Sequence, residues 1–241
     1  MHVIPAVDVL DGEVVRLNRG RFDEATRYSS DALAQVDAFA AQGAPLVHVV
    51  DLAGARSGRS TAKLWESLLV SDVRIQAGGG VRSAATASRL VDAGVSRVVV
   101  GTAAFDPRGP LDEMLSAVGT DRLVVALDVR DGRVRGSGWT DEGAPLAQIV
   151  DQLSVAGVSR VLVTQIERDG TLAGPDVALL DRVRNLAPGL AIVASGGVGS
   201  LEDVALLGTG DWEAVVVGKA LYERRFTYAE AAKTAQAALG I

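Results

Sequence analysis

The sequence predicts a single (β/α)8 barrel built from two similar halves. Three observations support this prediction: a length of 241 residues, an alternation of β-branched runs with Ala/Leu-rich segments, and motifs that recur about half a chain length apart. A barrel of this type takes about 250 residues, so one such domain would use the whole chain. We therefore expect one domain over residues 1–241, with half-barrels of about 1–120 and 121–241.

The composition suits this class and excludes several others. The chain is 48% hydrophobic and only 4% aromatic, as expected of Val-rich strands buried on both faces. Cysteine is absent, which excludes disulfides and thiolate metal sites and favours a cytoplasmic location. Asp8 and Asp11 interrupt the amino-terminal apolar run, so we expect no secretory signal, and no apolar run approaches the roughly 18 residues of a membrane span. A net charge of −6 argues against nucleic acid, but local backbone amides can still bind an anionic small molecule.

Short β-branched runs indicate eight strands, and the segments between them indicate helices. The expected strands are Val3–Asp8, Leu46–Asp51, Arg74–Ala77, Arg97–Gly101, Leu123–Asp128, Arg160–Gln165, Ala191–Ser195 and Ala214–Gly218. The clearest expected helices are Asp31–Gln42, Ala84–Ala93, Pro145–Ala156 and Leu201–Leu207. Such helices end at a glycine, as at Gly43, Gly94 and Gly157. Eight strands separated by helices fit a closed barrel, and an open doubly wound sheet is the competing arrangement.

Three pairs of motifs recur in the same order in the two halves. AVDVLDG at residues 6–12 matches ALDVRDG at 126–132, an offset of 120 residues. AGGGVRS at 77–83 matches ASGGVGS at 194–200, and VVVGTAA at 98–104 matches VVVGKAL at 215–221, both at an offset of 117. Self-similarity of this kind indicates two fused four-strand halves, which favours the closed barrel.

Two aspartates, Asp8 and Asp128, stand at equivalent strand ends in the two halves. Catalytic groups of this fold lie where strands end and the following loops begin, so both side chains are expected at one mouth of the barrel. A proton-transfer reaction needs one group that takes a proton and one that gives it. The alternative is that each Asp caps a helix or orders a turn.

Glycines follow the third, fourth, seventh and eighth strands, at Gly79-Gly80, Gly101, Gly196-Gly197 and Gly218. Without a Cβ atom the backbone can approach a phosphate closely, and its amides join a helix amino terminus in balancing the charge. This fold commonly binds phosphate after strands seven and eight, and the repeat supplies a second copy. Two such sites imply a ligand phosphorylated at both ends. The alternative is that the glycine pairs only make tight turns.

Other polar residues follow strands one, five and six. The loop after strand six can fold over a ligand and bring Asp169 or Thr171 inward, or it can be a solvated connection. Arg16 and Arg19 can pair with a phosphate or carboxamide, or be solvated, and Trp139 can stack on a heterocycle or serve in packing. Because His48 and His2 are the only histidines and the acidic residues lack ligand spacing, we expect no metal site.

Taken together, these segments resemble the HisA family of phosphoribosyl isomerases of histidine biosynthesis. The resemblance rests on IPAVDVLDGEVVRL, HVVDLAGA, GGGVRS, VVVGTAA, ALDVRDG, SGW, VTQIERDGTLAGP, ASGGVGS and VVVGKALYERRFT, and it covers Ile4 to about Thr227. It implies an Amadori rearrangement of the aminoaldose ProFAR to the aminoketose PRFAR, without metal or organic cofactor. The implied substrate carries a phosphate at each end, and no obligate protein partner is implied.

The resemblance also implies roles for individual residues. Asp8 is similar to the general base that removes the C2 proton, and Asp169 to the residue that protonates the ring oxygen. Asp128 and Thr164 match further active-site positions, so either Asp169 or Asp128 can be the acid. One phosphate would be bound by Gly80, Arg82, Gly101 and Thr102, and the other by Gly197, Gly218 and Lys219 beside Gly196. Trp139 would stack on the substrate, and Arg16, Arg19 and His48 would line the pocket.

One departure from the family and three alternatives stay open. Gln165 stands where the family has Asp, which puts a role of that position in setting neighbouring pKa values in doubt. Actinobacterial PriA relatives also isomerise phosphoribosylanthranilate, but Gly78 and the run before Trp139 favour the histidine-pathway reaction. The sister cyclase HisF, which needs a glutaminase partner, usually has a Lys-Gly segment where this chain has Arg16-Leu17-Asn18-Arg19. A non-catalytic diphosphate-binding barrel would leave the paired carboxylates unexplained.

Overall fold

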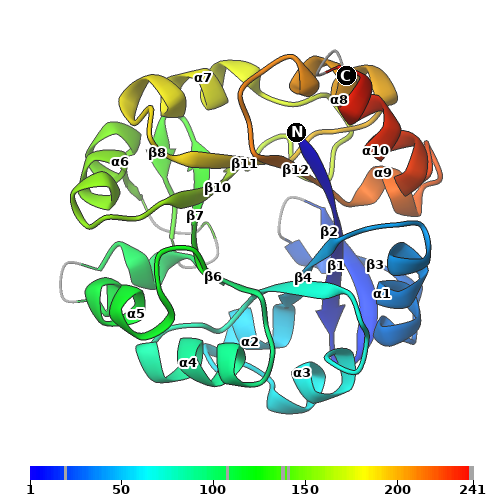
Figure 1. The fold of residues 1–241 in the computed structure, drawn as a ribbon, viewed down its shortest axis with the longest axis horizontal. Coiled ribbons are helices and arrows are strands. Elements are labelled where there is room, and N and C mark those ends of the chain that lie inside the picture. Colours follow the sequence, from blue (N-terminus) through cyan, green and yellow to red (C-terminus); the bar gives the residue numbers. More distant parts are fainter. Residues whose placement is uncertain (19–20, 107–108, 137–138, 140–141, 239–241) are drawn as a thin grey trace.

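A computed structural model of the chain describes residues 1–18, 21–106, 109–136, 139 and 142–238 (Figure 1). Eight parallel strands follow one another around a ring, and the pairings of β12 with β1 and of β7 with β10 close it. These strands are β1 (His2–Leu10), β4 (Leu46–Asp51), β5 (Arg74–Gly78), β6 (Arg97–Val100), β7 (Leu123–Arg130), β10 (Arg160–Gln165), β11 (Ala191–Ser195) and β12 (Ala214–Val217). The predicted (β/α)8 barrel is therefore confirmed, and the open sheet is excluded.

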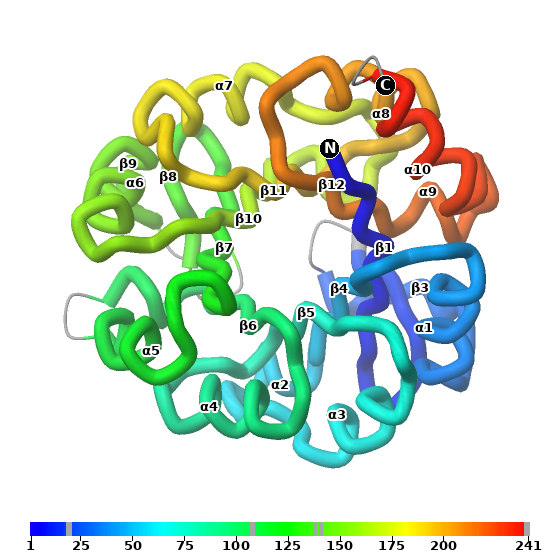
Figure 2. Tube along the Cα trace, viewed as in Figure 1, coloured from blue at the N-terminus to red at the C-terminus, as the bar shows by residue number. Residues whose placement is uncertain are grey.

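The helices lie outside this ring, and Figure 2 shows the chain passing once around it, so that the last helix returns to the first strand. Four helices match the expected ones within one or two residues: α1 (Ala32–Ala41), α4 (Ala84–Asp92), α6 (Leu146–Val155) and α8 (Leu201–Gly208). The others are α2 (Leu52–Ser57), α3 (Ala62–Leu68), the 3-10 turn η1 (Thr102–Ala104), α5 (Leu111–Val118), α7 (Val177–Leu186), α9 (Lys219–Tyr222) and α10 (Tyr228–Ala237). Closure is reinforced where the Tyr228 hydroxyl of α10 donates to the Val3 carbonyl of β1, at 3.3 Å.

The strands β1 and β7 run two residues past their expected ends because each continues into a hairpin. β1 turns through Asp11-Gly12 into β2 (Glu13–Asn18), and β7 turns through Asp131-Gly132 into β8 (Arg133–Val134). All four turn residues have positive φ, 52° and 87° in the first turn and 52° and 70° in the second. Asp-Gly is the preferred pair for a two-residue turn of this hand. The strands β3 (Arg21–Ser29) and β9 (Ala144–Pro145) extend the hairpins, where the sequence indicated only polar segments.

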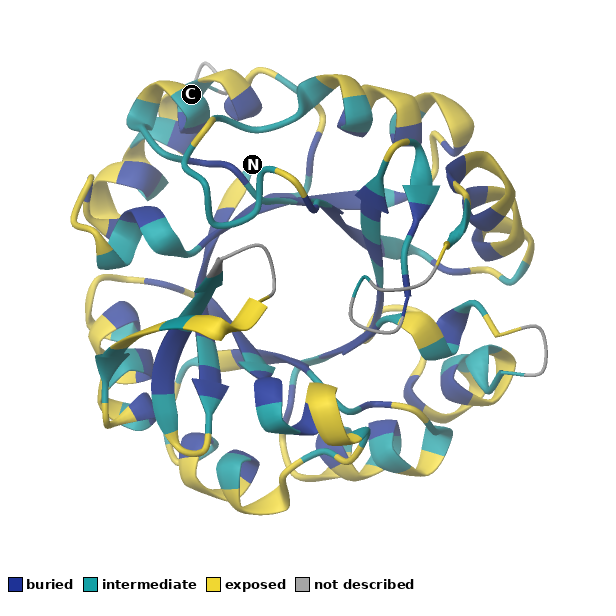
Figure 3. Cartoon of the chain, turned by 180° about the vertical axis from the view of Figure 1, so that it is seen from behind, coloured by how far each residue is buried: buried dark blue, intermediate teal, exposed yellow. Residues whose placement is uncertain are grey.

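Alternation along each strand divides the core into two layers. Inward-facing residues fill the barrel: Ile4, Ala6, Leu46, Val99, Val124, Leu162, Val193, Ala214 and Val216. The larger layer packs the outward faces of the strands against the helices, and Figure 3 shows the buried strands as a ring inside helices whose outer faces are exposed. No helix among the described residues is both long and apolar enough to cross a membrane.

Candidate functional site

At the carboxyl ends of the strands the inward-facing side chains are polar, whereas deeper in the barrel they are apolar. On β1 the inward series Ile4, Ala6 continues to Asp8, and on β10 it passes from Leu162 to Thr164. On β7 it reaches Asp128, which is the register partner of Thr164. Strand ends from both halves of the chain therefore present polar groups to one mouth of the barrel, as expected for this fold.

Asp8 is paired with Arg16, which comes from β2. The hairpin register places Val15 opposite Asp8, so the next residue, Arg16, reaches the same carboxylate, with 2.9 Å between Nη1 and Oδ2. Nη1 is buried and makes no properly angled hydrogen bond to any residue that the structure describes, so the contact is mainly an attraction between charges. Burial raises the pKa of Asp8, and the guanidinium of Arg16 opposes that rise. The arrangement holds a carboxylate whose ionised form depends on a nearby cation.

Asp169 joins this pair from the loop after β10. Burial raises its pKa to about 6, with Arg16 acting against the rise and the charges of Asp8 and Asp128 adding to it. Three carboxylates and one guanidinium therefore act on one another across the mouth. A carboxylic acid with a pKa near 6 can both give and take a proton near neutral pH.

The loop that carries Asp169 is fixed by its own backbone contacts. Arg168 donates from Nη1 to the carbonyls of Ala173, Gly174 and Pro175, at 3.3, 3.0 and 3.3 Å. The amide of Gly174 donates to the carbonyl of Gly197, at 2.9 Å, which joins the loop to the one after β11. The predicted inward placement of Asp169 thus has a structural cause: the loop folds back over the neighbouring strand ends instead of extending into solvent.

Asp128 has different partners from its counterpart Asp8. The side chains of Trp139 and Thr164 hydrogen-bond to it, and these bonds oppose the rise of its pKa that burial causes. A carboxylate that already accepts two hydrogen bonds is better suited to orient its partners than to exchange a proton. Trp139 has a positive φ of 72°, a backbone conformation that is uncommon for a bulky residue.

The loops after β11 and β12 form a pocket next to these carboxylates. It is lined by Arg16, Asp169, Gly170, Leu172, Ser195, Gly196, Gly197, Val198, Val216, Gly218 and Lys219. Gly196 and Gly197 both have positive φ, 92° and 87°, and a side chain on Gly197 would collide with the carbonyl of Gly174. A side chain on Gly218 would collide with the guanidinium of Arg16, which lies against this glycine. Glycine backbone that carries no side chain, together with Arg16 and Lys219, makes this pocket suitable for an anion.

Lys219 lies at the start of α9 and is engaged in the present arrangement. Its Nζ donates to the carbonyl of Gly170, at 2.8 Å, and lies 3.6 Å from Glu223. These contacts join the loop after β10 to the helix after β12. Lys219 therefore holds the loop and lines the pocket at once, so an entering anion would compete with one carbonyl and one carboxylate for its charge.

The equivalent loops of the first half are packed differently. A side chain on Gly79 would collide with the carbonyl of Asp51, and one on Gly80 with the backbone of Ser60, so close packing against the loop after β4 already requires both glycines. Arg82 is exposed and donates to the carbonyl of Ala55 in α2, at 3.4 Å. At the next strand end, Gly101 is followed by Thr102, which is exposed at the start of η1.

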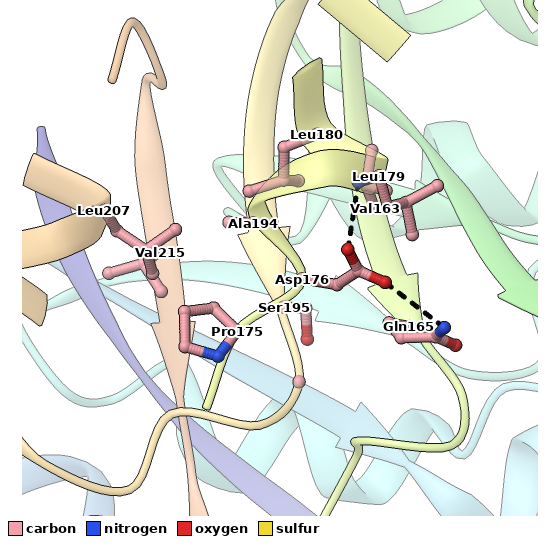
Figure 4. A pocket seen from close by; sticks show the side chains of 11 residues that line it. Val163, Gln165, Pro175, Asp176, Leu179, Leu180, Ala194, Ser195, Leu207 and Val215 are labelled. Atoms are coloured by element: carbon pink, nitrogen blue, oxygen red, sulfur yellow. Dashed lines mark hydrogen bonds between the residues drawn. The ribbon is translucent and has the colours of Figure 1, made fainter. Parts of the chain in front are cut away.

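Gln165 does not face the mouth of the barrel. Its Nε2 donates to Oδ2 of Asp176, at 3.4 Å, and Asp176 in turn accepts the amide of Leu179 at the start of α7 (Figure 4). The surrounding pocket lies outside the barrel wall and includes Val163 and Leu180. Its neighbour Thr164 is the residue that points inward and is buried. Gln165 therefore contacts the start of a helix and leaves the carboxylates at the mouth untouched.

Two polar groups near the site were missed by sequence reasoning. Tyr222, one turn after Lys219, lies 5.7 Å from the Arg16 guanidinium by its ring centre and donates its hydroxyl to the carbonyl of Ala6, at 2.9 Å. Gln76, on β5, hydrogen-bonds with His48 inside the barrel. A polar residue at an inward-facing position of an apolar strand is the signal that could have found Gln76.

His48 has the inward orientation that its strand position predicts. Its side chain is buried, and burial lowers its pKa to about 4, with the charge of Arg16 lowering it further, so the ring is neutral. The candidate Arg19 lies outside the described residues. Among the residues that the structure describes, no three His, Cys, Asp or Glu side chains gather as they would around a metal ion.

Comparison with known proteins places this geometry among related enzymes. The family model described as "Histidine biosynthesis protein" matches residues 2–227. A protein of Thermomicrobium roseum is 44% identical over 233 residues, covering 95% of each chain, and one of Klebsiella pneumoniae is 44% identical over 238 residues, covering 95% of this chain and 97% of the relative. A protein of Maricaulis maris is 42% identical over 237 residues, covering 96% and 97%. All three are named 1-(5-phosphoribosyl)-5-((5-phosphoribosylamino)methylideneamino)imidazole-4-carboxamide isomerase.

Proposed function

The chain belongs to the histidine biosynthesis protein family, and from that premise we propose that it catalyses the isomerisation for which those relatives are named. The reaction is the rearrangement of the aminoaldose ProFAR to the aminoketose PRFAR. The observation that carries this proposal is the approach of Asp8, Asp169 and Arg16 to one another beside a glycine-lined pocket at the barrel mouth. The relatives' names favour this reaction over that of phosphoribosylanthranilate.

In the proposed mechanism Asp169 is the acid and Asp8 the base. Asp169 donates its proton to the ring oxygen as the bond from that oxygen to C1 breaks, which leaves a protonated Schiff base. Asp8 then removes the proton from C2, because the cationic C=N group withdraws electrons and stabilises the enolamine that forms. Return of a proton to C1 and loss of the C2 hydroxyl proton complete the ketone. The raised pKa of Asp169, about 6, supports its assignment as the acid over Asp128.

Asp128 is proposed to orient Trp139 and Thr164 around the substrate. Its two side-chain hydrogen bonds support this role, and its charge contributes to the raised pKa of Asp169. We place Trp139 against the planar part of the substrate.

Two glycine-lined sites are proposed to hold the two phosphates. The pocket around Gly197, Gly218 and Lys219 would take one of them, and the glycine backbone and Arg16 that line it support this assignment. The loops with Gly80, Arg82, Gly101 and Thr102 would take the other, by analogy with their counterparts in the second half. To admit a phosphate at Gly218, the guanidinium of Arg16 has to turn from Asp8 toward the ligand, which would also free Asp8 to act as the base.

We propose that the enzyme works in the cytoplasm, without a cofactor or an obligate partner protein. The absence of cysteine supports the compartment, and the sequence after β1 supports independence from a glutaminase.

Asp8→Asn tests the assignment of the base, because Asn keeps the size of the side chain but cannot accept the C2 proton. We expect kcat for ProFAR to fall by at least about a hundredfold, in line with loss of a general base. Asp92→Asn, on the exposed face of α4, is the matched control and should leave kcat unchanged. Undiminished turnover by Asp8→Asn would refute the role of Asp8, and absence of turnover by the unmodified protein would refute the proposed function.

A further inference from the structure

A polar pair lies next to apolar side chains in the interior of the barrel. Gln76 of β5 and His48 of β4 are register partners on the inward face, with exposed fractions of 0% and 6%. On β1 the register partner of His48 is the aliphatic Ala6, and on β6 the register partner of Gln76 is Arg97, which is paired with Glu213. Polar groups buried at such a place are destabilising unless they are paired.

The contact between the two side chains determines which ring nitrogen carries the proton. Nε2 of Gln76 lies 3.2 Å from Nδ1 of His48. An amide nitrogen can only donate, so Nδ1 must accept, and the single proton of a neutral ring is then on Nε2. Burial and the nearby charge of Arg16 keep the ring neutral. The backbone of Gln76 also hydrogen-bonds to the ring, which raises the pKa of His48 against these two effects, and Nε2 is not among the described buried atoms that lack a hydrogen-bond partner.

The space above His48 leads to the mouth. Two residues further along β1, Asp8 pairs in register with Val50, so the candidate base lies one inward layer above the ring, about 7 Å along the strand. The residue above Gln76 on β5 is Gly78, which has no side chain, and a Cβ atom there would lie 3.7 Å from Cε1 of His48. The missing side chain leaves the ring open toward the carboxylates.

Only the nitrogen of the Gln76 side-chain amide has a hydrogen-bond partner among the described residues. Its Oε1 is fully buried and has no hydrogen-bond partner among the residues that the structure describes. A leucine at this position would fill similar space without an unpartnered oxygen, so stability alone does not account for Gln76. An amide that is kept despite this deficit is expected to act through the group it contacts.

We propose that Gln76 is a positioning residue, which holds the His48 ring in one orientation and one tautomer so that its Nε2–H donates to the substrate at the base of the mouth. The role of His48 as a donor rests on the proposed function, whereas the tautomer and its dependence on Gln76 do not. In many enzyme sites the hydrogen-bond partner of one ring nitrogen of a histidine determines whether the other ring nitrogen carries a proton.

The tautomer can be read directly, because the chain has only two histidines. In a His2→Gln background, His48 is the only histidine, and long-range proton–nitrogen NMR of its ring shows which nitrogen is protonated. We expect Nε2–H in this parent protein, a mixture of both tautomers in Gln76→Leu, and Nδ1–H in Gln76→Glu, whose carboxylate accepts instead of donating. Gln152→Leu, on the exposed surface of α6, is the control and should leave the spectrum unchanged. A ring protonated at Nδ1 in the parent protein would overturn the proposal.

A double-mutant cycle tests whether Gln76 acts through His48. We expect Gln76→Leu to lower kcat/KM for ProFAR roughly tenfold, the effect of one well-placed hydrogen bond, and to have almost no effect in a His48→Asn background. An equal loss in both backgrounds, or no loss in either, would overturn the positioning role. If the parent protein does not turn over ProFAR at all, the proposed function fails, and the NMR tautomers still decide whether Gln76 orients the ring.

Discussion

Replacement of Asp169 by Asn should stabilise the fold while it removes activity. In the folded protein the pKa of Asp169 is raised from 3.8 to about 6, mainly by burial, so its ionised form is less stable there than in the unfolded chain. A difference of about two pKa units corresponds to about 3 kcal/mol, and partial exposure of the side chain makes this an upper value. Asn is neutral at every pH and avoids this cost.

The upward direction of this pKa shift determines how the stability of the fold should depend on pH. Below pH 3.8 the carboxyl of Asp169 is protonated in both the folded and the unfolded protein, so it does not destabilise the fold there. Stability is lost as the pH rises through the interval from 3.8 to about 6 and stays lost above it. The stability difference between Asp169→Asn and the unmodified protein should therefore grow over that interval and reach up to about 3 kcal/mol at pH 7 and above.

Urea unfolding at a series of pH values from 4 to 8 measures this difference. The same preparations assayed with ProFAR should show that Asp169→Asn has lost at least about a hundredfold in kcat, as expected for loss of a general acid. Asp92→Asn, which changes an exposed carboxylate on α4, should show neither the pH-dependent gain nor the loss of turnover. A stability difference that is independent of pH, or an Asn variant less stable than the parent at pH 7, would refute the assignment of a buried, destabilised acid at this position.

Two further predictions concern the parts of the barrel that hold the site in place. Glu213 bridges Arg97 and Arg160 at the amino-terminal end of the barrel, with Oε1 2.6 Å from Arg97 and Oε2 2.5 Å from Arg160. Glu213→Gln removes the negative charge between these two partly buried guanidiniums. It should cost about 2–4 kcal/mol in urea unfolding at pH 7, with kcat unchanged. Burial raises the pKa of Glu213, but Arg160 and Arg97 outweigh the effect of burial and lower the pKa below its ordinary value. The stabilisation by these ion pairs should therefore be present at neutral pH and fade as the pH falls below about 4. If Glu213→Gln costs as much stability at pH 3 as at pH 7, the ion pairs are not the source of the stabilisation. Gly197→Ala places a side chain at a φ of 87°, where it collides with the carbonyl of Gly174. The variant should lower the stability of the fold by about 1–3 kcal/mol and raise KM for ProFAR. A KM equal to that of the unmodified protein would argue against phosphate binding at this loop.

Much of the barrel is determined by local sequence patterns. The alternation of β-branched residues identifies which residues face inward, and the offsets of the recurring motifs identify equivalent strand ends, so Asp8, Asp128 and Thr164 could be assigned to one mouth before any coordinates. The strand end at Asp11-Gly12 could not be assigned in this way, since an Asp-Gly pair either ends a strand or turns it into a hairpin, and the pairing of the next residues decides between the two.

Tertiary structure alone decided how the site residues act on one another. The contact of Arg16 with Asp8 depends on the hairpin register, and the outward direction of Gln165 depends on the position of α7. The raised pKa of Asp169 depends on desolvation and on charges that lie far apart in the chain. Periodicity identifies the face on which a side chain lies, but distances between segments, and the electrostatic energies that depend on those distances, exist only once the barrel has closed.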